Sequence, residues 1–272
     1  DIATDALPEK VHELFPDSVY ENSFGTVGIK TESANPTCKI IEVTTFRTEG
    51  VYTDKRRPDE VKFMKTIEED LARRDFTVNA LALSLAEGMA LNLELPATSY
   101  QLPALPIIDP YGGQDDLRDG IIRAVGDAGE RFREDALRLM RAVRFHAQLG
   151  FKIEKKTLTA VSEHADLLEH IASERIRDEL TKMLMTPRGA EGIEIMRTTG
   201  LLKFVLPELL DGVGCEQNQH HIYDVYEHNL KSLEYSVSKT HSLVVRLAAL
   251  LHDVGKPATR VWRVNRLGLL EW

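Results

Sequence analysis

The 272-residue sequence has few cysteines, no long hydrophobic run and no excess of basic residues. Its two cysteines, Cys38 and Cys215, cannot form a disulfide framework, which favours a reducing compartment, and we expect the cytoplasm. The best apolar stretch, residues 243–251, is broken by Arg246 and falls short of the roughly 20 residues that span a bilayer, so no membrane contact is expected. The net charge of −9, from 43 acidic and 34 basic residues, argues against a protein that coats nucleic acid without specificity.

The sequence pattern changes along the chain from mixed to helical. Residues 39–46 predict a strand with Ile41 and Val43 on one face and Glu42 on the other. Residues 68–85 predict a helix interrupted near Asp75, the prolines of 91–106 predict a loop, and residues 109–113 predict a tight turn. The remaining helices are expected at 132–149, 155–170, 173–185, 191–199, 224–235 and 243–253. The fold class is therefore α+β, with a small α/β head followed by an all-helical remainder.

A pair of arginines, Arg73 and Arg74, stands at the expected entrance of a helix. Because a helix N-terminus already carries partial positive charge, like charges gathered there fit an anion such as a triphosphate. Asp75 and Asn79 are four residues apart, so they lie on adjacent turns and can hydrogen-bond ribose hydroxyls. The same residues also fit a simple N-cap at Asp75 beside two solvated arginines, and both interpretations stay open.

A second group of charged residues follows at 131–144. Spacing of three and four residues places Glu134, Asp135, Arg138 and Arg141 on one helix face. An Asp and an Arg held side by side offer acceptors and planar donors that suit a nucleobase edge. An ordinary Glu134–Arg138 pair, worth about 0.3 kcal/mol, is the simpler interpretation, but it does not explain the row that continues to Arg144.

Histidines and an aspartate gather near the C-terminal end of the sequence. Gly255 and Pro257 predict that a helix ends near Asp253, where the helix dipole disfavours a carboxylate. A bound cation would reverse that penalty, with the neighbouring His252 as a natural second ligand. The alternative is a capped surface helix with incidental histidines.

Several motifs in order resemble one family. They are the opening Asp-Ile-Ala-Thr-Asp-Ala, the Arg-Arg-Asp-Phe-Thr-Val-Asn run, the Asp-Pro-Tyr-Gly-Gly turn and the Arg-Glu-Asp-Ala-Leu-Arg segment. Together with residues 173–180 and 200–209, they resemble the class II tRNA nucleotidyltransferase/poly(A) polymerase family, which comprises CCA-adding enzymes, CC- or A-adding variants and bacterial poly(A) polymerases. The resemblance implies a polymerase-β-like nucleotidyltransferase head at residues 1–125 and a helical neck and body at 126–210 that binds RNA and nucleotide. The order His228…His252-Asp253 resembles an HD phosphohydrolase domain, expected as a partial domain at 211–272.

The resemblance also implies an activity and its residues. Family members add C and A from CTP and ATP to the tRNA 3′ end without a nucleic-acid template, using two Mg²⁺ ions on an Asp-x-Asp pair. Asp1 aligns with the second aspartate of that pair and binds Mg²⁺, and Glu42 is the expected additional catalytic carboxylate. The family's motif for ribose and phosphate binding matches Arg73, Arg74, Asp75 and Asn79. The helix face that reads the incoming base matches Asp135, Arg138 and Arg141. A second divalent-metal site is implied at His228, His252 and Asp253.

The sequence departs from the family pattern at both ends. The Gly-Gly-x-x-Arg-Asp segment and the first aspartate of the metal pair would precede Asp1, which is not a methionine, so we expect a segment of a longer protein. Each Mg²⁺ needs several fixed oxygens, so this segment alone is expected to be nearly inactive. HD domains need a further aspartate downstream, which does not come before Trp272. Three alternatives stay open: a bacterial poly(A) polymerase, a non-catalytic RNA-binding protein, and an HD phosphohydrolase with the head as a scaffold.

Overall fold

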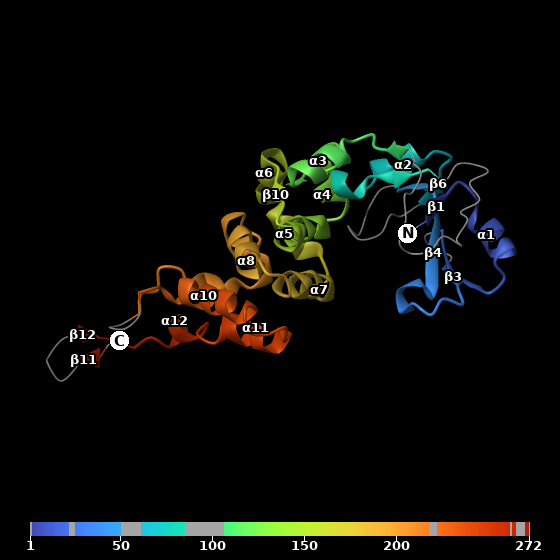
Figure 1. Ribbon diagram of the computed structural model, residues 1–272. Coiled ribbons are helices and arrows are strands. Elements are labelled where there is room, and N and C mark those ends of the chain that lie inside the picture. The colour runs from blue at the N-terminus through green and yellow to red at the C-terminus, as the bar shows by residue number, and fades with distance from the viewer. Residues whose placement is uncertain are drawn as a thin grey trace. The chain divides into compact units, whose positions relative to one another are not determined.

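The computed structural model describes residues 2–21, 25–49, 61–84, 106–217, 222–261, 263–264 and 270–271. The chain forms two compact units (Figure 1). The first comprises residues 1–53, 57–119 and 123–126, and the second comprises 54–56, 120–122 and 127–272. The division into three domains with borders near 125 and 210 stays a prediction, because these units do not separate residues 211–272 from the body.

A four-stranded sheet forms the base of the first unit, in the order β1–β4–β3–β2. Its strands are β1 (Ile2–Thr4), β2 (Ser18–Glu21), β3 (Thr26–Lys30) and β4 (Ile40–Thr45), with β1 parallel to β4 and the other pairs antiparallel. Helix α1 (Pro8–Leu14) packs on one face, where Val11, Val27 and Val43 form a core. The predicted strand at 39–46 is confirmed, with Val43 buried and Glu42 exposed on the opposite face.

Short elements complete the first unit. They are η1 (Pro36–Cys38), β5 (Arg47–Glu49), β6 (Val61–Phe63), α2 (Ile67–Ala72), η2 (Thr77–Asn79), β7 (Ala82–Leu83), β8 (Ile107–Ile108) and α3 (Gly113–Asp119). The predicted helix at 68–85 is wrong beyond Ala72, because Phe76 forms a β-bridge with Ala124 and the Thr77 N–H donates to the Arg123 carbonyl instead of to its own helix. The turn predicted at 109–113 is confirmed. The loop predicted at 91–106 lies outside the described residues apart from Pro106.

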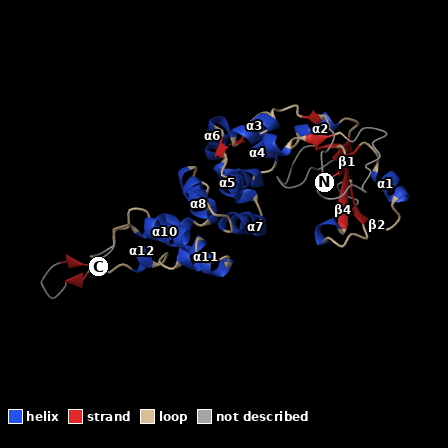
Figure 2. Ribbon diagram, viewed as in Figure 1, coloured by secondary structure: helices blue, strands red, loops and turns tan. Residues whose placement is uncertain are grey.

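Helices dominate the second unit (Figure 2). They are α4 (Ala128–Glu134), α5 (Leu137–Leu149), α6 (Lys155–Glu163), η3 (Ala165–His170), α7 (Ser173–Leu184), α8 (Gly189–Thr198), α9 (Leu202–Val205), η4 (Pro207–Gly212), α10 (Val225–Val237), α11 (Leu243–Leu251) and α12 (Lys256–Thr259). Two-residue strands pair β9 (Ile121–Ile122) with β10 (Lys152–Ile153) and β11 (Arg263–Val264) with β12 (Leu270–Glu271). The single helix predicted at 132–149 is wrong: it breaks at Asp135, whose side chain accepts the Leu137 N–H and so competes with the helical backbone.

The core of the second unit contains Arg246, the most deeply buried of its described arginines. Arg246 of α11, only 2% exposed, donates to the carbonyls of Leu184 at 2.7 Å, Thr186 at 3.1 Å and Thr240 at 3.1 Å. It thereby satisfies carbonyls at the end of α7, which a helix leaves without intrahelical partners.

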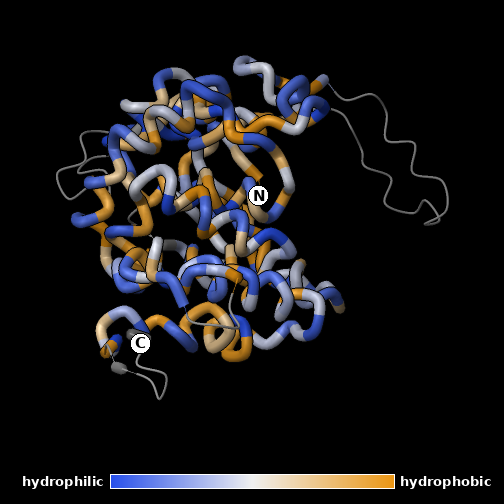
Figure 3. Tube along the Cα trace, turned by 90° about the vertical axis from the view of Figure 1, so that its left-hand side faces the viewer, coloured by the Kyte–Doolittle hydropathy of each residue, from blue (hydrophilic) through white to orange (hydrophobic). Residues whose placement is uncertain are grey.

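Hydrophilic residues interrupt the hydrophobic ones along the trace (Figure 3), and no helix within the described ranges has the length and apolar character to cross a membrane.

Candidate active site

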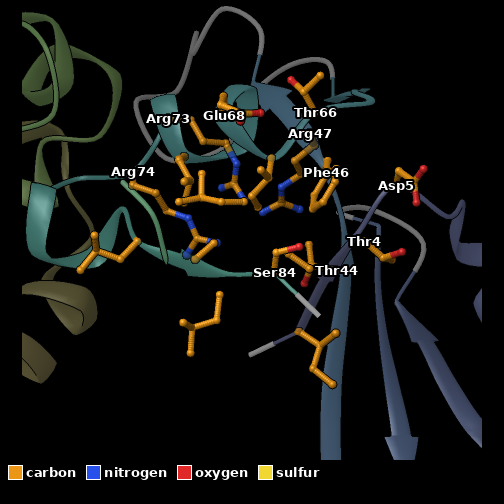
Figure 4. Close-up of a pocket in the computed structure, with 18 of the residues that line it drawn as sticks. Thr4, Asp5, Thr44, Phe46, Arg47, Thr66, Glu68, Arg73, Arg74 and Ser84 are labelled. Carbon is orange, nitrogen blue, oxygen red and sulfur yellow. The ribbon is translucent and has the colours of Figure 1, made fainter. Parts of the chain in front are cut away.

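A cavity of about 1290 Å³ opens in the first unit, on the face of the sheet that α1 does not cover. The sheet forms one wall, and α2 with the residues that follow it forms another (Figure 4). In Figure 4, Arg47, Arg73 and Arg74 reach toward the middle of the cavity, and Thr44 lies on the sheet. Pockets for single drug-sized ligands have volumes of about 300–1,000 Å³, so this space is large enough for more than one reactant.

Oxygen-bearing side chains form the sheet wall. Glu42 is exposed on β4 and pairs in register with Gly28 of β3, which places no side chain beside it. Two residues further along β4, on the same face, the hydroxyls of Thr26 and Thr44 lie 3.1 Å apart. Carboxylate and hydroxyl oxygens are hard ligands that suit Mg²⁺. Asp1, which directly precedes β1 in the sequence, lies outside the described residues.

The arginine pair lies at the opposite end of its helix from the one expected. Arg73 is the C-cap of α2 and Arg74 follows it, so the prediction that they open a helix is wrong. At a C-terminus the helix dipole favours positive charge, and an anion is therefore not needed to explain the pair. Both residues nevertheless line the cavity, with side chains 16% and 33% exposed.

A buried carboxylate binds both arginines. Asp70, whose side chain is 2% exposed, accepts from Arg73 Nε at 3.0 Å and Nη2 at 2.8 Å, and from Arg74 Nη2 at 3.1 Å. It also accepts the backbone N–H of Arg47 at 3.3 Å. Burial on its own raises the pKa of Asp70, but the Arg73 and Arg74 guanidinium groups outweigh it and hold this pKa below its usual range. Asp70 is therefore ionised at neutral pH.

Asp75 and Asn79 contact each other. Asp75 Oδ1 accepts from Asn79 Nδ2 at 3.0 Å and from the Phe76 N–H at 2.8 Å. Asp75 is 8% exposed and does not line the cavity, whereas Asn79 does. The alternative of an N-cap is not observed either, because the N-cap of η2 is Phe76. The structure thus places Asp75 behind Asn79, as the residue that orients it.

The turn before α3 supports the segment that carries Asn79. Asp109 accepts the N–H groups of Gly113 at 2.7 Å and Gln114 at 3.0 Å. Burial on its own raises the pKa of Asp109, but the backbone donors of Gln114 and Gly113 outweigh it and hold this pKa below its usual range. A Cβ on Gly113 would lie 2.2 Å from the Thr77 carbonyl oxygen, and Thr77 Oγ1 donates to Asp116 at 2.6 Å. Only glycine allows the turn to approach Thr77 this closely.

The charged group at 131–144 lies in the second unit and does not form one helix face, because α4 ends at Glu134. Asp135 pairs with Arg175 of α7 at 3.0 Å, and Arg138 pairs with Glu134 at 2.8 Å, as the simpler interpretation predicts. The row of arginines is not an exposed basic stripe: Arg144 is buried against Glu179 at 2.5 Å and Arg138 is 8% exposed, although Arg141 is partly exposed and lies over the Phe145 ring.

Three further predicted residues meet elsewhere in the second unit. His228 Nε2 lies 3.0 Å from His252 Nε2 and 3.5 Å from Asp253 Oδ2, and His252 Nε2 lies 3.4 Å from the same oxygen. Lys256 Nζ contacts Asp253 Oδ2 at 2.6 Å. The helix end predicted from Gly255 is displaced: α11 ends at Leu251, and Gly255 is the N-cap of the short α12.

Comparison with known proteins identifies the chain. Residues 1–123 match the family described as "Poly A polymerase head domain", and residues 150–212 match "Probable RNA and SrmB- binding site of polymerase A". The chain belongs to the tRNA nucleotidyltransferase and poly(A) polymerase family. Its fold class is confirmed, with a polymerase-β-like nucleotidyltransferase head and a helical remainder. Nucleotidyltransferases of this family use divalent metals.

Curated members of this family are similar over most of the chain. It is 45% identical to a CCA-adding enzyme of Geobacillus kaustophilus over 206 residues, which is 75% of this chain and 45% of that protein. It is 43% identical to a CCA-adding enzyme of Streptococcus gordonii over 267 residues, or 98% of this chain and 59% of that protein. The crystal structure of the Bacillus stearothermophilus CCA-adding enzyme in complex with CTP superposes with a TM-score of 0.67 and 34% identity, covering 93% of this chain and 53% of that one. The chain therefore spans about half the length of the relatives it matches.

Two partners of the site residues were not anticipated from sequence. Asp70 precedes the arginine pair by three and four residues, a spacing that predicts ion pairs on a helix and would have indicated it. Arg175, 40 residues from Asp135, gives no such local signal, because only the packing of α7 beside α5 brings it close.

Proposed function

We propose that the protein is a template-independent RNA nucleotidyltransferase that adds C, A or both from CTP and ATP to the tRNA 3′ end. The observation that carries this proposal is the cavity of the head, where exposed Glu42 and two hydroxyls lie on one wall and Arg73 and Arg74 on another. A triphosphate needs cations around its phosphates, and an attacking hydroxyl needs carboxylates that hold metal. The similarity to CCA-adding enzymes supports the same reaction.

Several charged and polar residues of the head have a proposed part in the reaction. Glu42, with Asp1, would hold Mg²⁺, which when bound would help to activate the RNA 3′-hydroxyl and would neutralise charge on the phosphates. Arg73 and Arg74 donate to phosphate oxygens, and Asn79, oriented by Asp75, donates to a ribose hydroxyl. The residues present fit the metal, because their side chains offer the oxygen ligands that Mg²⁺ prefers.

Base choice is assigned to Asp135 and Arg138, with Arg141 beside them. Cytosine and adenine both carry an exocyclic amino group next to a ring nitrogen acceptor, whereas guanine and uracil carry a carbonyl at that position. A carboxylate accepts from the amino group and a guanidinium donates to the ring nitrogen, so an Asp–Arg pair favours C and A over G and U.

Nucleotide incorporation separates the alternatives. Because the sequence alone is expected to be nearly inactive, the chain is extended at its N-terminus by the Gly-Gly-x-x-Arg-Asp segment and first aspartate of a relative. It is then incubated with Mg²⁺, labelled CTP or ATP, and either tRNA lacking its 3′ CCA or a generic RNA. CTP incorporation on the tRNA supports CCA-type addition, and ATP addition on any RNA would identify a poly(A) polymerase. RNA binding without incorporation would favour a non-catalytic RNA-binding protein. Asp135→Ala and Arg138→Ala are expected to lose discrimination against UTP and GTP, whereas Arg133→Ala, an exposed arginine of α4, serves as the control.

The proposed place of action is the cytoplasm. The two cysteines are free thiols, Cys38 exposed and Cys215 buried, which fits a reducing compartment.

A second candidate function is divalent-metal binding in the second unit. Zinc–nitrogen bonds of about 2.0–2.1 Å separate neighbouring tetrahedral ligands by about 3.4 Å, close to the spacings among His228, His252 and Asp253. Lys256 would have to leave Asp253 for the metal to bind. Metal analysis of purified protein tests the site, with Lys256→Ala expected to bind metal more tightly and His252→Ala to lose it. Hydrolysis of a 2′,3′-cyclic phosphate by the metal-loaded protein would assign the HD-type activity.

A further inference from the structure

A buried carboxylate that has no direct part in the proposed reaction contacts two arginines that line the cavity of the head. Asp70 Oδ1 accepts from Arg73 and from the Arg47 backbone, and its Oδ2 accepts from Arg74. Its side chain is only 2% exposed, so the Asp70 carboxylate contacts the two arginines on their buried side. One carboxylate thus joins α2, the residues after α2 and the start of β5.

The arginines need this carboxylate to stay together. Two guanidinium groups repel each other, and the repulsion is stronger where solvent is partly excluded. Arg73 is bound through two of its nitrogens, which fixes the plane of its guanidinium group. Arg74 is bound through Nη2, and within the described part of the chain its buried Nε has no hydrogen-bond partner. A buried donor left without a partner beside a cavity indicates an acceptor that arrives with a ligand.

We propose that Asp70 is a positioning residue that holds Arg73 and Arg74 in the geometry that binds the triphosphate of the incoming nucleotide. This inference rests on the proposed function and adds a residue to it. The alternative is that Asp70 is a counter-ion that competes with the triphosphate for the arginines. The two hypotheses predict opposite changes in triphosphate affinity when the Asp70 charge is removed. Removal of a competing negative charge strengthens phosphate binding, whereas removal of a positioning group weakens it.

The test compares ligands that differ only in phosphate number. Equilibrium binding of cytidine, CMP and CTP to the full chain is measured in Mg²⁺ by calorimetry. Asp70→Asn keeps the shape of the side chain and removes its charge. Charge-assisted hydrogen bonds are stronger than neutral ones, so the ratio of CTP to cytidine affinity is expected to fall about tenfold, while cytidine affinity is unchanged.

Two further variants complete the design. Glu69→Gln removes one charge from the same helix, at a residue whose partner is Thr66, and is expected to leave the ratio unchanged. Asp70→Glu keeps the charge and moves the carboxylate by one methylene, and is expected to lie between wild type and Asp70→Asn. If Asp70→Asn does not fold, Asp70→Glu decides the question by the same ratio.

The possible outcomes distinguish a failure of this inference from a failure of the proposed function. A wild-type protein that binds no CTP would overturn the nucleotide site and the inference together. If the wild-type protein binds CTP more tightly than cytidine but the Asp70 variants keep or increase that ratio, the positioning role is wrong and the proposed function stands.

Discussion

Substitution of Gly113 by alanine is expected to destabilise the head, and its neighbour Gly112 provides the control. The added Cβ of Gly113→Ala would lie 2.2 Å from the Thr77 carbonyl oxygen and 2.9 Å from its carbonyl carbon. Both are backbone atoms that cannot rotate away, and Thr77 is itself held by Asp116. Overpacking a tight site costs about 1–3 kcal/mol and occasionally more, so about 3 kcal/mol is expected here. At a Gly112 Cβ there is open space, and the cost comes only from its φ of 72°, about 1 kcal/mol.

Thermal and urea unfolding of both variants measure the difference. With roughly 4 °C per kcal/mol for a unit of this size, Gly113→Ala is expected to lower the Tm of the head by roughly 12 °C and Gly112→Ala by roughly 4 °C. CTP binding should weaken in Gly113→Ala, because Thr77 belongs to the segment that carries Asn79. Equal shifts for the two variants, or a larger one for Gly112→Ala, would refute the close packing of the turn on Thr77.

Two further predictions concern buried charge. Glu179→Gln removes the negative charge that pairs with buried Arg144, and the arginine left without a counter-charge is expected to cost about 3 kcal/mol in urea unfolding; a loss under about 1 kcal/mol would contradict a tight ion pair. Acid should destabilise the head. The folded-state pKa values of Asp70 and Asp109 are lowered, so the stability they contribute is complete above the unfolded carboxyl pKa of about 3.9 and is lost as the pH falls further. Melting curves of wild type and Asp109→Asn across this range check the sign: the variant should show the flatter dependence.

Local patterns and distant contacts explain which sequence predictions were correct. The strand at β4 was predictable because alternation along six residues already reports which side is buried. The helix expected beyond Ala72 failed because the Thr77 N–H finds its acceptor at Arg123, 46 positions away, and no local pattern shows that bond. The same wrong helix prediction placed Arg73 at the start of a helix, whereas it lies at the end of α2.

The candidate sites show the same division. Glu42 could be placed from its strand, and the convergence of His228 with His252 and Asp253 agrees with the structure. The pairing of Asp135 with Arg175 could not be read from spacing, since it depends on how two helices pack. The roles of these residues stay predictions until binding and incorporation are measured.

The parallel pairing of β1 with β4 has a consequence for the order in which the head folds. Ile2 meets Val43, so this contact closes a loop of about forty residues, and the entropy of closing it opposes early formation. The hairpins β2–β3 and β3–β4 join strands much closer in sequence and can form first. The strand beside Glu42 would then be the last to dock, and the cavity would acquire its sheet wall only at the end of folding. Until β1 docks, the edge of β4 keeps unpaired backbone N–H and C=O groups. We expect chaperones or misfolded copies to compete with native pairing at this edge.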